Sequence, residues 1–213
     1  PNLISQITSE PICRSRTTMA KMRKPNRNIR LNRRALLGAT AALMLPQAAR
    51  AFSVADGQRT HLIMRHALAP GGGDPPNFDL RDCSTQRNLN EQGREQARAT
   101  GDRIRALGIG IDHVLSSQWC RCLETAELLD LGPVEEAPAI NSFFSARERA
   151  QEKTAAIREQ LLAMPADQTA LLVTHWVNVI ALIDRAPSSG EVFAFSIRDS
   201  GEITVHDSFV IAP

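Results

Sequence analysis

The sequence of 213 residues has no hydrophobic run long enough to cross a membrane. Its apolar run over residues 35–45 is well short of the ~20 residues that a transmembrane helix needs, so we expect no stable membrane span. A basic stretch precedes this run, and Pro46 and the small-residue end Ala49-Arg50-Ala51 follow it. These are the three parts of a secretory signal, so we expect residues 19–51 to be an export signal peptide.

Two adjacent arginines, Arg33 and Arg34, stand directly before the apolar run. This arrangement resembles the twin-arginine type of export signal, and the alternative is an ordinary signal in which the two arginines are incidental. Residues 1–18 fit neither a signal nor a domain, and we expect them to be an upstream extension, with Met19 or Met22 as the start. Residues 52–213 are then the functional domain of a bacterial protein that is periplasmic or otherwise exported.

Acidic residues are almost absent from the first 51 positions, where Glu10 stands against ten lysines and arginines. Removing these from the chain's 25 Lys+Arg and 23 Asp+Glu leaves 15 basic and 22 acidic side chains, a net charge of −7. The basicity of the whole chain therefore belongs to its leader. We expect no nucleic-acid binding by the domain.

Cysteine is scarce, with Cys83, Cys120 and Cys122 in the domain and Cys13 in the extension. An oxidising compartment permits a disulfide. Cys83 could pair over a long range with Cys120 or with Cys122, which are themselves too close in sequence to pair well. The alternative is three free or buried thiols.

The domain has no internal repeats, and the glycine- and proline-rich residues 69–76 indicate a loop. Elsewhere short apolar strands alternate with helical patterns. We expect strands at 61–64, 111–115, 134–140 and 169–174, and helices at 91–107, 119–130, 145–163 and up to about 184. Residues 191–197 and 202–205 should close the domain as a hairpin. This order predicts an α/β fold, a three-layer α/β/α sandwich with a mainly parallel sheet.

The helix over residues 91–107 should begin after the capping residue Asn90 and end at Gly108. Its inward line is mostly small: Gly93, Ala97, Gly101 and Ile104. Small residues at this spacing suit close packing on a sheet.

Arginine and histidine follow three of the expected strands. Arg65-His66 ends the first strand, Arg121 comes soon after the second, and His175 ends the fourth. Ligand sites in such sheets lie at the carboxyl ends of the strands, so these residues should converge. Arginine pairs bidentately with phosphate oxygens, and imidazole can accept a phosphoryl group. This set can neutralise phosphate without a metal, and no His, Asp or Glu spacing resembles a zinc site.

Four segments, taken together, resemble the histidine phosphatase superfamily, also called the phosphoglycerate mutase-like family. They are residues 62–67 with Arg65-His66-Ala67, 86–97, 115–126 and 172–175. The resemblance implies that His66 is the nucleophile that becomes phosphohistidine. It also implies that Arg65 and Arg121 bind the phosphate, and that His175 completes the pocket and stabilises the transferring phosphoryl group.

The implied activity is hydrolysis of a phosphomonoester or phosphoramidate by a metal-independent phosphatase that needs no cofactor. Its substrate would be a small phosphorylated molecule, such as a phosphosugar or phosphohistidine. A mutase is not expected. Arg87 could reach an extended substrate or make a structural salt bridge. The sequence leaves the oligomeric state open.

The chain departs from the family pattern at the proton donor. Many members carry a glutamate just after the third strand, where this chain has Asn141, because Glu135 and Glu136 come too early. Trp176 follows His175, so the His-Asp pair of another branch is absent too. The chain resembles small, acid-poor members, which include protein-phosphohistidine phosphatases and exported enzymes acting on lipopolysaccharide sugars. The proton donor stays unassigned.

Several simpler readings remain beside this one. A phosphate-binding or sensing module would keep the pocket without turnover, and a cytosolic phosphohistidine phosphatase would keep its leader uncleaved. We expect Glu124 to form an i,i+3 ion pair with Arg121. Trp176 could form a wall of the pocket, although a core role is the default for tryptophan. The remaining histidines are expected to be packing or surface residues: His61, His113 and His206.

Overall fold

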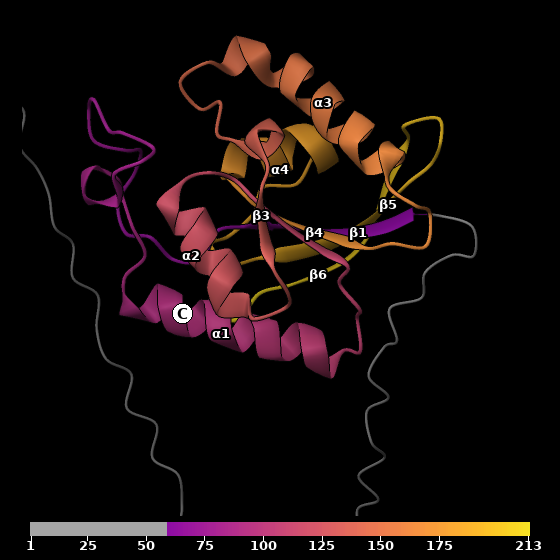
Figure 1. The fold of residues 1–213 in the computed structure, drawn as a ribbon, viewed down its shortest axis with the longest axis horizontal. Helices are drawn as coiled ribbons and strands as arrows, with labels where there is room; N and C mark the ends of the chain where they lie inside the picture. The colour runs from indigo at the N-terminus through magenta and orange to yellow at the C-terminus, as the bar shows by residue number, and fades with distance from the viewer. Residues whose placement is uncertain (1–58) are drawn as a thin grey trace, which may run out of the picture. The chain divides into compact units, whose positions relative to one another are not determined.

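A computed structural model describes residues 59–213, which contain one six-stranded sheet in the order β3-β2-β4-β1-β5-β6 (Figure 1). The expected upstream extension and export signal, residues 1–18 and 19–51, lie outside the described residues. No helix in the described part of the chain is long and apolar enough to cross a membrane. The strands are β1 (Arg59–Arg65), β2 (His113–Ser116), β3 (Val134–Glu136), β4 (Ala170–Thr174), β5 (Val192–Ile197) and β6 (Ile203–Phe209).

Four helices cover the two faces of this sheet. They are α1 (Glu91–Ala106), α2 (Cys120–Leu129), α3 (Ala150–Ala163) and α4 (Trp176–Ile183). Strands β1 to β4 pair in parallel, and β5 and β6 add an antiparallel hairpin beside β1. The α/β fold with a mainly parallel sheet and a closing hairpin is therefore confirmed.

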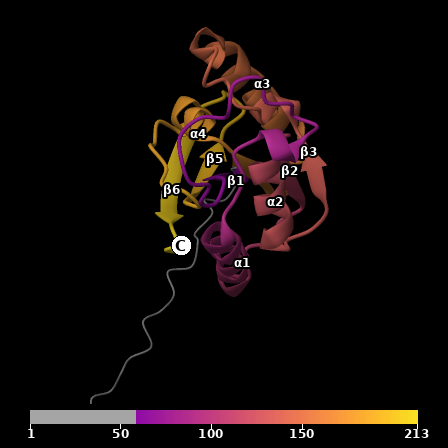
Figure 2. The ribbon, with the colours of Figure 1, turned by 90° about the vertical axis from the view of Figure 1, so that its left-hand side faces the viewer.

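The core has two large clusters, one on each face of the sheet, and a smaller third one that includes Ala67 and Ala97. On β1, Leu62 and Met64 pack with residues of α1 and α2, whereas Ile63 packs with residues of α3 and α4. Figures 1 and 2 show α3 and α4 on the face of the sheet opposite α1. Because successive side chains of a strand point to opposite faces, a strand buried on both sides is apolar throughout. The three-layer arrangement follows from this pattern.

Helix α1 packs closely on its neighbours because two of its inward residues lack a side chain. Asn90 caps the helix, its side-chain oxygen accepting a hydrogen bond from the backbone N–H of Gly93 at 2.9 Å. A Cβ added at Gly93 would lie 2.1 Å from the carbonyl oxygen of Leu68, and one added at Gly101 would lie 2.0 Å from that of Leu129. The small-residue line therefore serves close packing, but against the loop after β1 and against α2 rather than on the sheet as expected.

Substituting Gly101→Ala should destabilise the domain strongly. The added methyl group cannot fit against the backbone of α2 unless the two helices move apart, and such overpacking costs about 1–3 kcal/mol or more. Gly110→Ala is the matched control, because a Cβ there meets no atom within 4 Å. Denaturant unfolding of both variants checks the prediction, which fails if the two lose similar amounts of stability.

Three element boundaries differ from expectation by four residues or more. The third strand ends at Glu136, and residues Pro138–Ile140 form a 3₁₀ turn, because proline lacks the N–H that a strand ladder requires. The long helix begins at Ala150 rather than Ser145, after a 3₁₀ turn over Arg147–Arg149. Strand β6 continues to Phe209, four residues beyond the expected end.

His61 on β1 is a fully buried packing residue. Its Nδ1 accepts a hydrogen bond from the N–H of Ala170 at 3.2 Å, and its ring lies 5.8 Å from that of Phe195. Burial, with the charge of Arg59 as a smaller cause, lowers the pKa of His61 to about 4. The folded protein therefore holds His61 neutral where the unfolded chain would bind a proton.

The free energy of unfolding should consequently decrease as the pH is lowered. The unfolded His61 takes up a proton at about pH 6.5 and the folded one only near pH 4, so acidification across this window favours unfolding by roughly 2–3 kcal/mol. His61→Asn should weaken this dependence while its Oδ1 still accepts from Ala170. Urea unfolding at pH 7 and pH 4.5 measures the effect. An equal loss of stability in wild type and His61→Asn would contradict it.

Candidate active site

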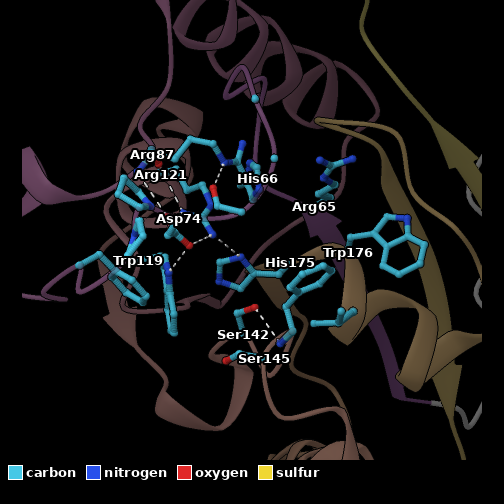
Figure 3. Close-up of a pocket in the computed structure, with 18 of the residues that line it drawn as sticks. Arg65, His66, Asp74, Arg87, Trp119, Arg121, Ser142, Ser145, His175 and Trp176 are labelled. Atoms are coloured by element: carbon cyan, nitrogen blue, oxygen red, sulfur yellow. Dashed lines mark hydrogen bonds and ion pairs between the residues drawn. The ribbon is translucent and has the colours of Figure 1, made fainter.

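A cavity of about 650 Å³ lies at the carboxyl ends of β1 and β4. Figure 3 shows the side chains that line it, among them all five residues that the sequence singled out. These are Arg65, His66, Arg87, Arg121 and His175. The structure thus brings the residues of three strand ends together, as the parallel topology requires. Their chemical roles stay predictions.

The local structure fixes the tautomer of His66, which is only 2% exposed. Its Nδ1 lies 2.7 Å from the carbonyl oxygen of Ala67. A carbonyl can only accept, so Nδ1 carries the proton and Nε2 carries the lone pair. Nε2 has no hydrogen-bond partner among residues 59–213. Burial first, and then the positive charge of Arg121, hold the pKa of His66 well below its usual value, which keeps the ring neutral.

His175 is held by both ring nitrogens. Its Nδ1 lies 3.3 Å from a guanidinium nitrogen of Arg121, which can only donate, so the proton resides on Nε2. That Nε2 donates to Ser117 Oγ at 2.8 Å, and Ser117 Oγ donates to Asn141 Oδ1 at 3.2 Å. Burial and the charge of Arg121 hold the pKa of His175 well below its usual value. The rings of His66 and His175 meet edge to face, with centroids 5.7 Å apart.

Asp74 is a residue of this site that the sequence did not reveal. Its two carboxylate oxygens accept from the two terminal nitrogens of Arg121 at 2.6 and 3.1 Å. The indole N–H of Trp119 donates to it at 3.1 Å, and the backbone N–H of Arg87 donates at 3.3 Å. Figure 3 shows Asp74 between Trp119 and Arg121. A carboxylate of the domain's own thus sits in the fork that would bind a phosphate.

This pair corrects the expected partner of Arg121. Glu124, one turn further along α2, bonds Arg94 at 2.6 Å instead. Arg121 is 3% exposed and turned inward toward the cavity, whereas Glu124 is half-buried on the side of α2 that faces α1. The i,i+3 spacing predicted an ion pair between Arg121 and Glu124. The two side chains point in different directions from α2, so this pair does not form.

Arg87 lines the cavity and holds the loop that carries Asp74. Its Nε donates to the carbonyl oxygen of Gly73 at 2.8 Å, and one terminal nitrogen donates to that of Ala69. Arg87 forms no salt bridge among residues 59–213. Its structural contacts are hydrogen bonds to backbone carbonyls instead of the salt bridge that the sequence offered as an alternative. Burial and the nearby charge of Arg121 lower the pKa of Arg87.

Arg65 is the cavity's least engaged cation. One terminal nitrogen donates weakly to the carbonyl oxygen of Pro187 at 3.4 Å, and its buried Nε has no partner in the described part of the chain. Burial and the charge of Arg121 lower the pKa of Arg65. Three guanidinium groups therefore share this cavity with the single carboxylate of Asp74. The excess positive charge favours binding of an anion.

Cys122 is buried and uncharged beside His175. Its sulfur lies 3.5 Å from Nε2 of that ring, and burial raises the pKa of the thiol to about 12. A thiolate is the reactive form of cysteine, so this thiol is no nucleophile near neutral pH. Within residues 59–213, no group of three or more His, Cys, Asp or Glu could hold a metal ion.

The position after β3 supplies no acid, as the sequence indicated. Asn141 accepts a hydrogen bond from the backbone N–H of Gln118 at 2.9 Å and does not line the cavity. Glu135 and Glu136 lie on β3 and contact His113 and Gln118. Asp74 is the only carboxylate among the described residues that line the cavity.

Aromatic side chains form the outer wall of the cavity. Trp176, the first residue of α4, lines it and is 40% exposed, so the default expectation of a core role is wrong. Phe78 and Phe144 line it as well. Phe78 packs on Trp119, and the guanidinium of Arg147 lies 4.8 Å above the ring of Phe144.

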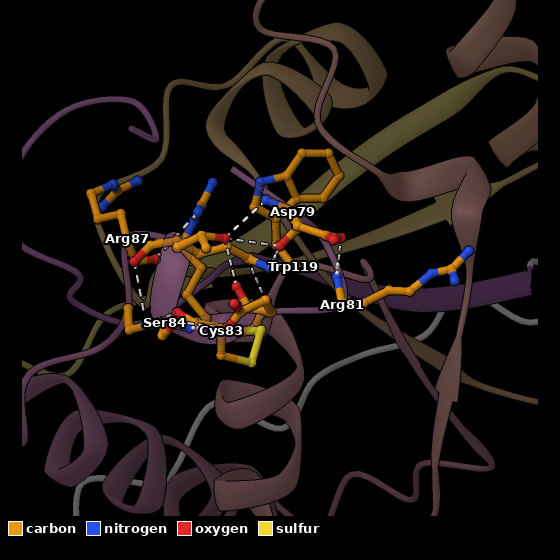
Figure 4. Close-up of a disulfide and its surroundings, with 12 residues drawn as sticks. Asp79, Arg81, Cys83, Ser84, Arg87 and Trp119 are labelled. Carbon is orange, nitrogen blue, oxygen red and sulfur yellow. Dashed lines mark hydrogen bonds between the residues drawn. A yellow bond between two sulfur atoms is a disulfide. The ribbon is translucent and has the colours of Figure 1, made fainter. Parts of the chain in front are cut away.

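A disulfide joins Cys83 to Cys120 and closes off the open choice between Cys120 and Cys122 (Figure 4). Cys120 is the first residue of α2, next to Arg121, and Cys83 lies on the segment that leads to Arg87. Gln86 reinforces the link, its side-chain oxygen accepting from the N–H of Cys120 at 3.1 Å. The bridge ties the two arginine-bearing segments together.

Removing this bridge should destabilise the domain. The bond closes a loop with a sequence separation of 37 residues, for which the loss of constraint on the unfolded chain is worth roughly 2–4 kcal/mol. We expect Cys83→Ala/Cys120→Ala to melt at a lower temperature than wild type. A reductant should lower the melting temperature of wild type and leave that of the double variant unchanged. An equal response of both proteins would contradict the prediction.

The described domain is thus an α/β protein with a cavity at the carboxyl edge of its sheet, and three arginines and one aspartate line this cavity. Residues 62–143 match the family described as histidine phosphatase superfamily (branch 1). The domain superposes on the protein histidine phosphatase SixA complexed with tungstate, with a TM-score of 0.53 and 18% identity, over 71% of this chain and 96% of that one. It also superposes on a mycobacterial glucosyl-3-phosphoglycerate phosphatase complexed with VO₃, with a TM-score of 0.54 and 16% identity, over 70% and 97% of the two chains.

A sequence relative is the mitochondrial serine/threonine-protein phosphatase Pgam5 of Drosophila willistoni. The chain is 43% identical to it over 52 residues, which are 24% of this chain and 18% of that protein. The match therefore spans less than a fifth of the relative. Over residues 62–143 the chain is thus similar to the histidine phosphatase superfamily, and its fold is similar to that of phosphatases.

Proposed function

We propose that this protein is a phosphatase that hydrolyses a small phosphomonoester or phosphoramidate through a phosphohistidine on His66. The observation that carries the proposal is the state of His66 in the cavity. Its Nδ1 proton is held by the carbonyl of Ala67, and its Nε2 lone pair is free beside three arginines. A neutral imidazole with a free Nε2 is the form that attacks phosphorus.

The proposed reaction has two in-line steps. The lone pair of His66 Nε2 attacks phosphorus, the bond to the leaving group breaks, and the leaving group takes its electron pair and a proton. Water then attacks the phosphohistidine, the P–N bond breaks, and its electron pair returns to Nε2. Arg65 and Arg121 bind the phosphoryl oxygens. His175 donates to them from Nε2, which without substrate donates to Ser117 Oγ.

The export of the protein is part of the proposal. A disulfide between Cys83 and Cys120 is typical of proteins that work in an oxidising compartment such as the periplasm. The twin-arginine-like signal over residues 19–51 would deliver the domain there after folding. The natural substrate would then be a phosphosugar or phosphoramidate met outside the cytoplasm.

Trapping of the phosphoenzyme tests the mechanism. The purified protein is mixed with ³²P-labelled aryl phosphate in the presence of a chelator, quenched within milliseconds and digested. We expect label on the peptide that contains His66, stable in base and lost in acid, as phosphohistidine is. Label on a serine, or turnover that the chelator abolishes, would overturn the proposal.

Two observations favour the second candidate, a phosphate-binding or sensing module without turnover. The position after β3 offers Asn141 instead of an acid, and the fork of Arg121 is already occupied. Such a module would bind phosphate or vanadate and release no product from the aryl ester. Phosphate release by the wild type excludes it.

A further inference from the structure

We infer that Asp74 is the proton donor to the leaving group, which neither the sequence motifs nor the position after β3 supplies. The inference rests on the proposed phosphatase function and names a residue for its unassigned step. The cavity contains one acidic side chain, and no other described residue that lines it has a carboxyl group. The side chain of Asp74 is 11% exposed, so bulk water has little access to its carboxyl group.

The contacts of Asp74 place it beside Arg121, a residue proposed to bind the phosphate. It shares Arg121 with the site that would hold the phosphate, and Trp119 and the N–H of Arg87 hold its other lone pairs. Trp119 in turn packs edge to face on His175, with ring centroids 5.1 Å apart. Trp119 and the N–H of Arg87 are thus two donors to the carboxylate that a substrate need not displace.

Substrate binding should change the charge of this carboxylate. Without substrate, burial acts to raise the pKa of Asp74, but the hydrogen bonds and charge of Arg121, together with the hydrogen bonds from Arg87 and Trp119, hold that pKa below its usual value. A bound phosphate competes for the fork of Arg121 and brings negative charge beside Asp74. Both changes favour the protonated carboxyl group, since a like charge and the loss of a cation raise the pKa of an acid.

The loop around Asp74 can permit the small shift that this exchange needs. Three glycines precede Asp74, and Gly71 and Gly73 have positive φ angles of 91° and 70°. Pro75 and Pro76 follow it. Glycine adopts such conformations without steric cost, and Arg87 holds the loop. In the inferred step, rotation of the Asp74 side chain carries the carboxyl group from Arg121 to the leaving oxygen.

The proton balance of the two steps is then closed. Asp74 gives its proton to the leaving oxygen as His66 Nε2 forms the P–N bond, and the alcohol departs neutral. The carboxylate that remains takes a proton from the water that attacks the phosphohistidine. Asp74 is thereby protonated again, and the phosphate leaves with the oxygen of that water.

The experiment compares Asp74→Asn with wild type on a pair of substrates, an aryl phosphate and an alkyl phosphate. General acid catalysis is worth about 10²–10⁴-fold, and an alkoxide needs it far more than a phenolate does. We expect the alkyl rate of Asp74→Asn to fall at least about 100-fold more than its aryl rate, and the basic limb of its pH profile to be lost. Asp79→Asn is the matched control, because Asp79 lies on the same segment, exposed and outside the cavity.

The outcomes separate the inference from the function. Equal loss on both substrates, or equal gain because a competing anion is gone, would overturn the role of Asp74 and leave the phosphatase intact. Wild-type turnover of the aryl ester alone would also overturn it, since a working donor should serve the alkyl ester. Absence of all wild-type turnover would overturn the proposed function, and the inference with it.

Discussion

His66→Asn should lower the turnover of an aryl phosphate by roughly 10⁴- to 10⁶-fold, the scale seen when an enzyme loses its nucleophile. The asparagine amide can still donate to the carbonyl of Ala67, as Nδ1 does at 2.7 Å, so the local backbone should survive. What is lost is Nε2, the lone pair that forms the P–N bond. Initial rates at saturating substrate, with unfolding curves beside them, measure the effect.

The control is the same substitution at an exposed histidine, His206→Asn. His206 lies on β6, where its ring contacts Ser196 at 2.9 Å and does not line the cavity. We expect its turnover to match wild type. Retention of a tenth or more of the activity by His66→Asn would contradict nucleophilic attack by His66.

Much of this site could be predicted from the sequence because it depends on strand ends. Arg65, His66 and His175 directly follow apolar strands, and a parallel sheet brings such ends to one edge. The order of strands and helices was predictable for the same reason. Apolar runs and helical periodicity report burial, and burial decides which face of each element turns to the core.

Asp74 could not be predicted in this way. It lies in a loop of glycines and prolines that carries no periodicity, and it meets Arg121 across a separation of 47 residues. The one signal was composition, a lone acid inside an otherwise uncharged loop close to an arginine-rich site. Proximity in sequence favoured Glu124 instead, which the helix turns toward Arg94.

The disulfide partner depended on helical geometry that spacing alone does not reveal. Cys120 and Cys122 are two residues apart on α2, so their side chains point about 200° apart around the axis. Cys122 is fully buried against the sheet, whereas Cys120 faces the segment that carries Cys83. Knowing where α2 begins and which face packs on the sheet would have decided the pairing.

Arg121→Lys should lower kcat/KM for an aryl phosphate by about 10²–10³-fold, although the positive charge is kept. The guanidinium makes three side-chain hydrogen bonds at once: one to each carboxylate oxygen of Asp74, and one to Nδ1 of His175 at 3.3 Å. An ammonium group is a point donor without this planar fork, so it cannot hold two oxygens and a ring nitrogen in fixed directions. The tautomer of His175 and the phosphate site should both be disturbed.

The matched control is Arg98→Lys on the exposed side of α1, where the arginine makes only a long ion pair with Glu91 at 3.8 Å. Its kcat/KM should stay within about twofold of wild type, because such surface pairs contribute little. Vanadate inhibition distinguishes the two roles of Arg121. If the fork binds the phosphoryl group, the inhibition constant of Arg121→Lys should rise together with the loss of kcat/KM. If vanadate binds as tightly as to wild type while turnover falls, Arg121 acts by orienting His175 and Asp74 instead.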